Sequence, residues 1–319
     1  MNSIPLIFNE REINRTVLGG KRNSTQAKMD VSVILLNSGG SVLRIQNLEN
    51  LQNCGFEKII SMEPNNENYN FEDFINKFPT AKFIVPQEEV SDGDLINIGM
   101  AETDSKYVLV LRDTVQVSSF ILTSNNAQKL IDKDCFCYVP RMSIDDNKSL
   151  STNFMPSVHK GVFKVDSTSL ITDMLSTLYP LDFIGMYNRQ KFIQLGGFDY
   201  TIRSPYWQNL DLAFRAWLWG EEIKITTGFQ ISYLSDAPVE DTTSNLSQFR
   251  FYLKNLAPVF KLDHGEIPST AILRTLRRSP CGFIETLKQF DDAKEWVLKN
   301  QYRFKTDAAG LISNWGNLK

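Results

Sequence analysis

Between residues 31 and 111, continuous apolar runs alternate with segments whose apolar residues recur at the spacing of a helix. The first run, Val31–Leu36, is apolar at every position except Ser32, which is typical of a strand buried on both faces of a sheet. Three later runs have the same character: residues 58–62, 83–85 and 107–111. Strands that alternate with helices in this way predict a doubly wound, mostly parallel sheet, whose ligands bind at the carboxyl ends of the strands.

The three segments between these runs have the features of helices. In the first segment, one apolar residue recurs at every third position: Val42, Ile45, Leu48 and Leu51. Gly55 then follows as a predicted C-terminal cap. The second helix is expected over residues 71–78 and ends before Pro79, which cannot continue it. The third begins at Ser91 or Asp92, because a short polar side chain there accepts a hydrogen bond from the first turn.

The second half of the chain mixes both kinds of element. We expect strands at 136–139, 181–187, 223–225 and 229–234, and helices at 188–195 and 208–219. Asp211 and Arg215 lie four residues apart on the second of these helices and are predicted to pair. The pattern is helical beyond residue 243, with its longest helix at 281–303. The predicted organisation is a polar arm at 1–29, an α/β domain at 30–242 and a helical extension at 243–319.

Composition excludes several classes of function. The net charge of −3 provides no overall field for nucleic acid, and two histidines offer little to a zinc enzyme. No apolar stretch reaches the roughly 18 residues of a membrane-spanning helix. The four cysteines have no metal or disulfide spacing, which predicts reduced thiols. We therefore expect a cytoplasmic protein, with the membrane surface as the alternative location. A basic cluster near the C-terminus could contact phosphate or a membrane surface: Arg274, Arg277 and Arg278.

Three segments, in order, resemble family 2 glycosyltransferases. The first is the 31–36 strand with its loop and helix. The second is Ser91–Gly99, followed by the 107–111 strand, which ends where the family has its metal-binding DxD motif. The third is Leu195-Gly196-Gly197-Phe198-Asp199 and then Trp207–Leu212, which looks like the family's "GGFD … EDxDL" stretch. Over roughly residues 31–235, the resemblance implies a GT-A, nucleotide-diphospho-sugar transferase fold, with a Rossmann-like, mostly parallel sheet and a helical C-terminal region.

The sequence departs from the family where the chemistry is done. In the family, a divalent metal held by carboxylates neutralises the leaving diphosphate, and a carboxylate removes the acceptor's proton. Here the DxD place reads Arg112-Asp113-Thr114 and the ED place reads Gln208-Asn209. An amide cannot take a proton at neutral pH. The resemblance thus implies a site without its usual metal ligands, and Mn²⁺ or Mg²⁺ remains an alternative if acidic ligands come from elsewhere.

The resemblance also assigns roles to individual residues. Nucleotide-sugar contacts fall at strand ends and at the start of the third helix: Leu36, Asn37, Glu63, Asp92, Asn97, Arg112, Asp113 and Thr114. Arg112 would replace the metal and pair with the diphosphate; the alternative is a surface cation paired with Asp104. The catalytic candidates are Asp199, Asn209 and Asp211, and the acceptor-binding candidates are Trp207 and Gln208. Simpler alternatives remain open: Asp92 as a helix cap, Asp211 as the partner of Arg215, and Trp207 as a core residue.

Two functions from different classes remain. The first is a metal-independent glycosyltransferase that moves a sugar from a nucleotide-sugar donor, UDP-linked by preference, to a glycan or lipid-linked acceptor in polysaccharide assembly. The second is a catalytically inactive GT-A-fold protein that binds or scaffolds. The extension at 243–319 is expected either to cover the acceptor side or to form a homodimer through its helices.

Overall fold

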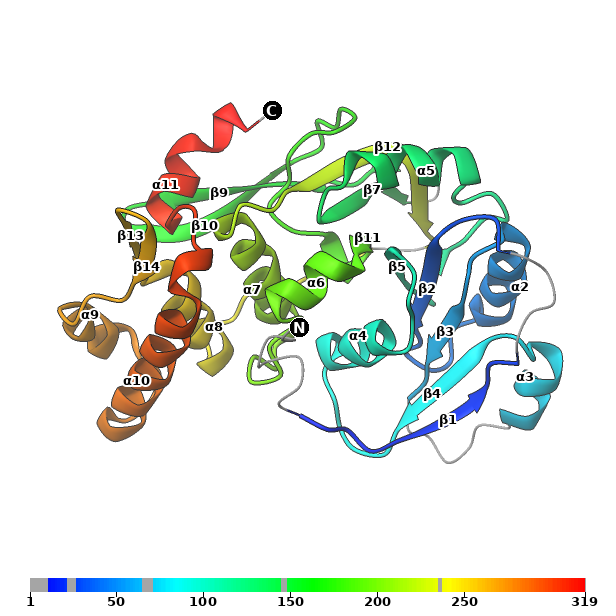
Figure 1. Cartoon of the computed structure of the whole chain (residues 1–319), viewed down its shortest axis with the longest axis horizontal. Helices are drawn as coiled ribbons and strands as arrows, with labels where there is room; N and C mark the ends of the chain where they lie inside the picture. Colours follow the sequence, from blue (N-terminus) through cyan, green and yellow to red (C-terminus); the bar gives the residue numbers. More distant parts are fainter. Residues whose placement is uncertain (1–10, 22–26, 65–70, 145–147, 235–236, 319) are drawn as a thin grey trace.

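The computed structural model describes residues 11–21, 27–64, 71–144, 148–234 and 237–318 (Figure 1). One ten-stranded sheet runs through the described chain in the order β1-β4-β3-β2-β5-β11-β7-β12-β6, with β8 paired to β7. Its strands are β1 Arg15–Gly19, β2 Val31–Leu36, β3 Ile59–Met62, β4 Lys82–Pro86, β5 Tyr107–Arg112, β6 Val115–Gln116, β7 Cys137–Ile144, β8 Lys148–Ser149, β11 Gly185–Asn188 and β12 Ile223–Tyr233. In Figure 1, β1 to β4 lie at one end of the molecule and the C-terminal helices at the other.

The predicted parallel unit is confirmed in strands β4, β3, β2 and β5, which run parallel to one another. Their connections contain three helices: α2 Arg44–Cys54, α3 Phe71–Lys77 and α4 Asp92–Ala101. Ser91 caps α4 in a reciprocal capping box with Asp94, and Gly55 ends α2 in the left-handed conformation. Gly99 lets α4 approach β2 closely, because a Cβ there would lie 2.5 Å from the Ile34 side chain.

The sequence misjudged the buried face of α2. Val42 is 89% exposed and Ile45 is 44% exposed, although Leu48 and Leu51 are buried as expected. The buried face instead includes Asn47, whose side-chain amide donates to the backbone oxygen of Val115 at 2.8 Å. On this face of α2, a polar contact with the start of β6 therefore takes the place of the predicted apolar stripe. The sequence also missed β1, which pairs antiparallel with β4 inside the predicted N-terminal arm.

The second half extends the same sheet with strands of mixed direction: β11 pairs antiparallel with β7, and β12 pairs parallel with β7. Strand β11 pairs antiparallel with β5, so it joins the parallel unit to the later strands. The two strand segments predicted at 223–234 form one strand, β12, with an irregularity between Thr226 and Gln230. The other elements in this half of the chain are α5 Ser124–Lys133, the 3-10 helix Leu181–Phe183, α6 Arg189–Leu195, α7 Pro205–Leu218 and a hairpin of β9 Asn153–His159 and β10 Val162–Thr168. That hairpin was not predicted.

The C-terminal region is helical except for a short hairpin that the sequence pattern did not reveal. Its elements are α8 Leu246–Phe251, the π-helical turn Tyr252–Leu256, β13 Val259–Lys261, β14 His264–Glu266, α9 Ala271–Arg278, α10 Phe283–Asn300, the 3-10 helix Gln301–Arg303, α11 Ala308–Asn314 and the 3-10 helix Trp315–Asn317. Trp219 stacks on Trp296 with ring centroids 6.0 Å apart, which fixes α10 against the end of α7. Among the described residues, no helix combines the length and the apolar character needed to cross a membrane.

Candidate functional site

The carboxyl ends of β2, β3 and β5 bring together the predicted nucleotide-binding residues. Leu36 is in register with Met62 on one side and with Arg112 on the other. Asn37 and Glu63 follow directly, and Asp113 follows β5. The parallel register therefore places these polar residues at one edge of the sheet, as the sequence predicted.

Glu63 is held in a buried polar network. Its carboxylate accepts hydrogen bonds from the Asn37 amide at 2.7 Å and the Ser61 hydroxyl at 2.6 Å. It also pairs with the Arg44 guanidinium at 2.7 Å, and Arg44 in turn lies 3.8 Å above the centre of the Phe74 ring. Both oxygens of Glu63 are thus engaged in joining β2, β3 and the start of α2. A contact to the nucleotide would have to share one of these bonds.

Asp113 shapes the loop that follows β2. Its carboxylate accepts from the Ser38 hydroxyl at 2.9 Å and from the Ser38 backbone N–H at 3.2 Å, and its side chain is fully buried. Its backbone oxygen accepts from the Ser41 hydroxyl at 2.7 Å. Thr114 next to it is exposed. Asp113 therefore fixes the backbone of a loop with two glycines, Gly39 and Gly40, that both have positive φ.

Arg112 is clamped by two carboxylates at the end of β5. Its Nη2 lies 2.7 Å from Asp92 at the start of α4, and its Nε lies 2.5 Å from Asp182. The alternative partner considered from the sequence is wrong, because Asp104 pairs with Lys58 at 3.2 Å. Burial raises the pKa of Asp182, although Arg112 opposes that effect. The side chain of Arg112 remains 16% exposed.

The residues around Arg112 do not fit a divalent metal. The described residues contain no group of three or more His, Cys, Asp or Glu side chains arranged to hold an ion. The two carboxylates best placed for a metal, Asp92 and Asp182, already share the fixed charge of Arg112. A cation bound between them would have to displace the guanidinium and its charge-assisted hydrogen bonds.

Two predicted residues instead join α4 to the loop after α6. The Asn97 amide exchanges two hydrogen bonds with the backbone of Phe198, at 2.8 and 2.9 Å. Gln208 accepts from the Gly93 N–H at 3.1 Å and donates to the Ser91 hydroxyl at 2.9 Å. Gln208 is fully buried, so it is not placed to touch an acceptor. Both amides hold the N-terminal turn of α4, and with it Asp92, next to Arg112.

Trp207 lies in the core and not on an acceptor surface. The ring is 5% exposed, and its Nε1 donates to the backbone oxygen of Thr243 at 3.0 Å. Tyr206 and Phe251 pack on it, with ring centroids 4.8 and 5.5 Å away. With this burial and these ring contacts, the structure favours the core alternative over the predicted acceptor contact.

The carboxylates predicted as bases are locked in a buried ion cluster. Asp211 pairs with Arg215 at 2.6 Å, as its position on the helix predicted, and both side chains are fully buried. Lys254 lies 2.6 Å from Asp199 and 3.4 Å from Asp211. Burial alone would raise the pKa of Asp199, but Lys254 holds that pKa well below its ordinary range. Asp199 is thus held ionised, and Asp211 is engaged with two buried cations, so the geometry favours a structural role for both.

Asn209 also has a structural partner. Its side-chain amide donates to the backbone oxygen of Pro180 at 2.7 Å, and the residue is 2% exposed. That bond holds the turn that precedes Asp182, whose backbone has a positive φ of 53°. Asn209 therefore supports the carboxylate that clamps Arg112, and it is not itself a group that exchanges protons.

Glu240 is a carboxyl group that the sequence analysis did not single out. It follows β12 and accepts a hydrogen bond of 2.5 Å from the Tyr179 hydroxyl. Burial, together with the nearby charge of Asp182, raises the pKa of Glu240 to about 7. The Tyr233 hydroxyl donates to Asp182 at 3.2 Å. No motif marks Glu240; the pairing of distant residues in the fold gives it this environment.

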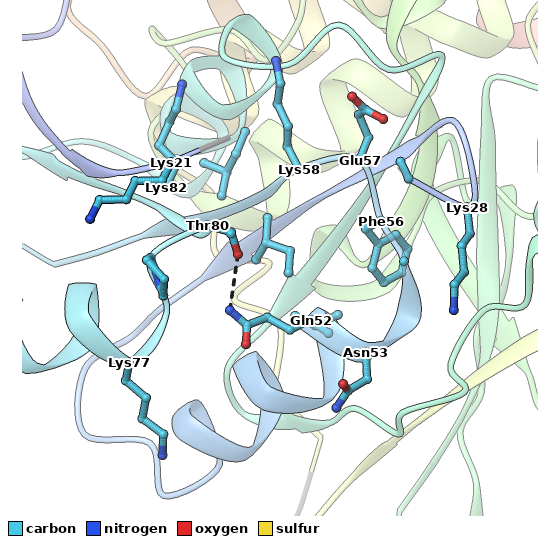
Figure 2. Close-up of a pocket in the computed structure, with 17 residues that line it drawn as sticks. Lys21, Lys28, Gln52, Asn53, Phe56, Glu57, Lys58, Lys77, Thr80 and Lys82 are labelled. Atoms are coloured by element: carbon cyan, nitrogen blue, oxygen red, sulfur yellow. Dashed lines mark hydrogen bonds between the residues drawn. The ribbon is translucent and has the colours of Figure 1, made fainter. Parts of the chain in front are cut away.

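A cavity of about 1030 Å³ lies at the opposite end of the parallel strands (Figure 2). It is lined by residues before or at the start of β3 and β4, and Figure 2 shows several lysines around it, among them Lys58, Lys77 and Lys82. Each of these three pairs with a carboxylate: Asp104, Glu49 and Glu102 respectively. None of the predicted site residues lines it, and ligands of parallel sheets bind at the other end.

Comparison with known proteins identifies the fold. No protein-family model and no curated protein matches the sequence. Among solved structures, the chain is similar to GalNAc-T7 with UDP, GalNAc and Mn²⁺, with a TM-score of 0.58 and 12% identity over 89% of this chain. It is also similar to S. aureus TarS 1–349 in complex with UDP-GlcNAc, with a TM-score of 0.51 and 11% identity over 83% of this chain. The matched regions span 57% and 71% of those chains. The chain therefore has the α/β fold of GT-A-type glycosyltransferases.

Proposed function

We propose that this chain binds a nucleotide sugar at the carboxyl ends of β2, β3 and β5 and transfers the sugar without a metal ion. The observation that carries the proposal is the position of Arg112, a partly exposed cation at the end of β5, where the family resemblance expects the metal site. Two glycosyltransferase structures of similar fold are described with UDP or a UDP-sugar, which supports a UDP-linked donor. Membership of family 2 is part of the same proposal.

Arg112 would stabilise the diphosphate as it leaves. The bond between the anomeric carbon and the diphosphate breaks with its electrons on the phosphate oxygen, so negative charge grows there. A guanidinium presents two parallel N–H donors to such oxygens and remains charged at any physiological pH. Asp92 and Asp182 hold the group in place before the donor arrives. The diphosphate would take over part of their hydrogen bonding, which keeps the charge of Arg112 compensated throughout.

Glu240 is the proton acceptor in this proposal, because Asp92 and Asp182 are already paired with Arg112. A general base works best when its pKa lies near the working pH, and the pKa of Glu240 is raised to about 7. The acceptor hydroxyl would attack the anomeric carbon and pass its proton to Glu240, while Tyr179 orients the carboxylate. Asp199 and Asp211 are not used as bases, because both are engaged in buried ion pairs.

The alternative is a catalytically inactive protein that binds a partner or a glycan. The observation that favours it is the number of predicted catalytic groups whose bonding is already complete: Asp199, Asn209 and Asp211. In this alternative the fold is retained for recognition, and the ion pairs serve stability alone. Only the first proposal, sugar transfer, requires an acceptor, which would be a glycan or a lipid-linked saccharide.

An assay of sugar transfer distinguishes the metal-independent transferase from the inactive binding protein. The assay measures release of nucleoside diphosphate from UDP- and GDP-sugars in the presence of a chelator. We expect slow turnover by the wild type and loss of turnover, with retained donor binding, in Glu240→Gln. The matched control is Glu89→Gln, an exposed glutamate that should leave turnover unchanged. Donor binding by the wild type without any turnover, with glycan and lipid-linked acceptors present, would favour the inactive alternative.

A further inference from the structure

Helices α9 and α10 lie at the end of the molecule farthest from the parallel strands (Figure 1). Both helices expose large apolar side chains. Leu273 is 68% exposed on α9, and Phe283 and Ile284 are 63% and 82% exposed in the first turn of α10. Arg274 and Arg277 are exposed on α9 beside them. We call these five residues the tip surface. Neighbouring exposed apolar side chains of this size mark sites of interaction more often than scattered ones do.

The tip surface is held rigidly by contacts on its inner side. Thr275 of α9 is fully buried, and the guanidinium of Arg278 lies 5.0 Å from the centre of the Tyr252 ring. The hydroxyls of Ser279 and Thr286 are 2.6 Å apart, which joins the end of α9 to the first turns of α10. Because the inner faces are fixed in this way, the outward position of the tip residues is a property of the fold.

The segment that carries the tip surface is positively charged, in contrast to the rest of the chain. Residues 271–288 contain four basic side chains and one acidic side chain, although the whole chain has a net charge of −3. The acidic one, Glu285, accepts from the Gln289 amide at 2.8 Å. Apolar side chains surrounded by arginines are typical of segments that lie in the interface of an anionic membrane.

We propose that the tip surface docks the protein on an anionic lipid bilayer. Phe283 and Ile284 enter the headgroup region, while Arg274 and Arg277 meet lipid phosphates. A second copy of the chain suits this surface less well, because a two-fold contact would bring the same arginines of both copies together. The net negative charge of the chain also opposes a nucleic-acid partner. The proposal is independent of catalytic activity and of Arg112.

Co-sedimentation of the full chain with vesicles tests this proposal. We expect binding to phosphatidylcholine vesicles that contain phosphatidylglycerol, little binding to pure phosphatidylcholine, and weaker binding as salt increases. Arg274→Gln with Arg277→Gln should weaken binding roughly 25-fold, at about fivefold for each cation near an anionic surface. Phe283→Ser with Ile284→Ser should weaken it by on the order of tenfold or more. Leu298→Ser, an exposed leucine elsewhere on α10, is the control and should bind like the wild type.

Three outcomes would overturn the proposal: no binding at low salt, equal binding to both kinds of vesicle, or binding that neither double variant reduces. Each variant should keep the wild-type unfolding midpoint and far-ultraviolet spectrum, because the altered side chains are exposed. Light scattering after gel filtration is run on the same samples. If the apolar variant instead converts a dimer to a monomer without affecting vesicle binding, the tip surface is a self-association site and the membrane proposal fails.

Discussion

Replacing Glu240 with glutamine removes a charge while keeping an oxygen that can accept from Tyr179. The wild-type carboxyl is partly buried and lies near Asp182, and its pKa is raised from 4.5 to about 7. Between these two values the folded protein keeps a proton that the unfolded chain has lost. The contribution of Glu240 to stability is therefore fully present below pH 4.5 and is lost as the pH rises through about 7.

The size of the effect follows from the two pKa values. Each pKa unit corresponds to about 1.4 kcal/mol, so the difference between 4.5 and about 7 amounts to about 3 kcal/mol. The glutamine variant does not titrate at this position. The free energy of unfolding of the wild type, minus that of Glu240→Gln, should thus fall by up to about 3 kcal/mol as the pH rises from about 4 to about 8.5.

Urea unfolding of the wild type and Glu240→Gln across that pH range gives the difference in unfolding free energy directly. The contributions of all other titrating groups cancel to first order, because both proteins contain them. Glu89→Gln serves as the control, and its difference from the wild type should stay flat. A wild-type minus Glu240→Gln difference that does not change with pH would mean that Glu240 titrates normally. The proposed base would then lose its physical justification.

Other changes probe the structural roles assigned to the remaining residues. Asp211→Asn leaves the buried Arg215 without its carboxylate partner and Lys254 with Asp199 alone, and it should lower the free energy of unfolding by about 3 to 5 kcal/mol. Its control, Glu295→Gln, breaks the exposed pair with Lys299 and should change little in the same urea experiment. Gly93→Ala would place a Cβ 2.5 Å from Gln208 and 2.7 Å from Phe198, so it should cost about 1 to 3 kcal/mol and weaken nucleotide binding in titration calorimetry. A stable Gly93→Ala protein with normal affinity would show that the α4 start does not position the site. Trp207→Phe loses the bond to Thr243 and should cost about 1 kcal/mol in urea unfolding; a change in sugar turnover without a stability change would restore its acceptor role.

The parallel half of the fold was predictable because local signals agree there. The buried run at Val31–Leu36, the cap at Ser91 and the glycine at Gly55 each specify one element, and the register of parallel strands then brings their ends together. The hairpin of β9 and β10 was missed because neither strand contains a strong apolar run and β10 is mostly exposed. Strand β1 was missed because its residues are mostly exposed at the edge of the sheet.

The site was harder to predict because its important contacts join distant parts of the chain. The sequence placed Arg112 at the ligand edge, but its partner Asp182 lies in a short 3-10 helix with no motif. The i,i+4 pair of Asp211 and Arg215 was visible locally, whereas Lys254, which completes the cluster, lies in a π-helical turn far along the chain. Glu240 acquires its raised pKa from burial, a property that no local pattern reports.

Isothermal titration of the protein with UDP, with a chelator and then with manganese, tests the central claim most directly. The account predicts binding that is unchanged by manganese and is weakened on the order of tenfold to 100-fold in Arg112→Gln, because a charge-assisted contact to the diphosphate is lost. The unfolding midpoint of the variant, measured in parallel, shows that the protein remains folded. Binding that requires manganese, or that is the same in folded Arg112→Gln, would contradict a nucleotide site built around Arg112.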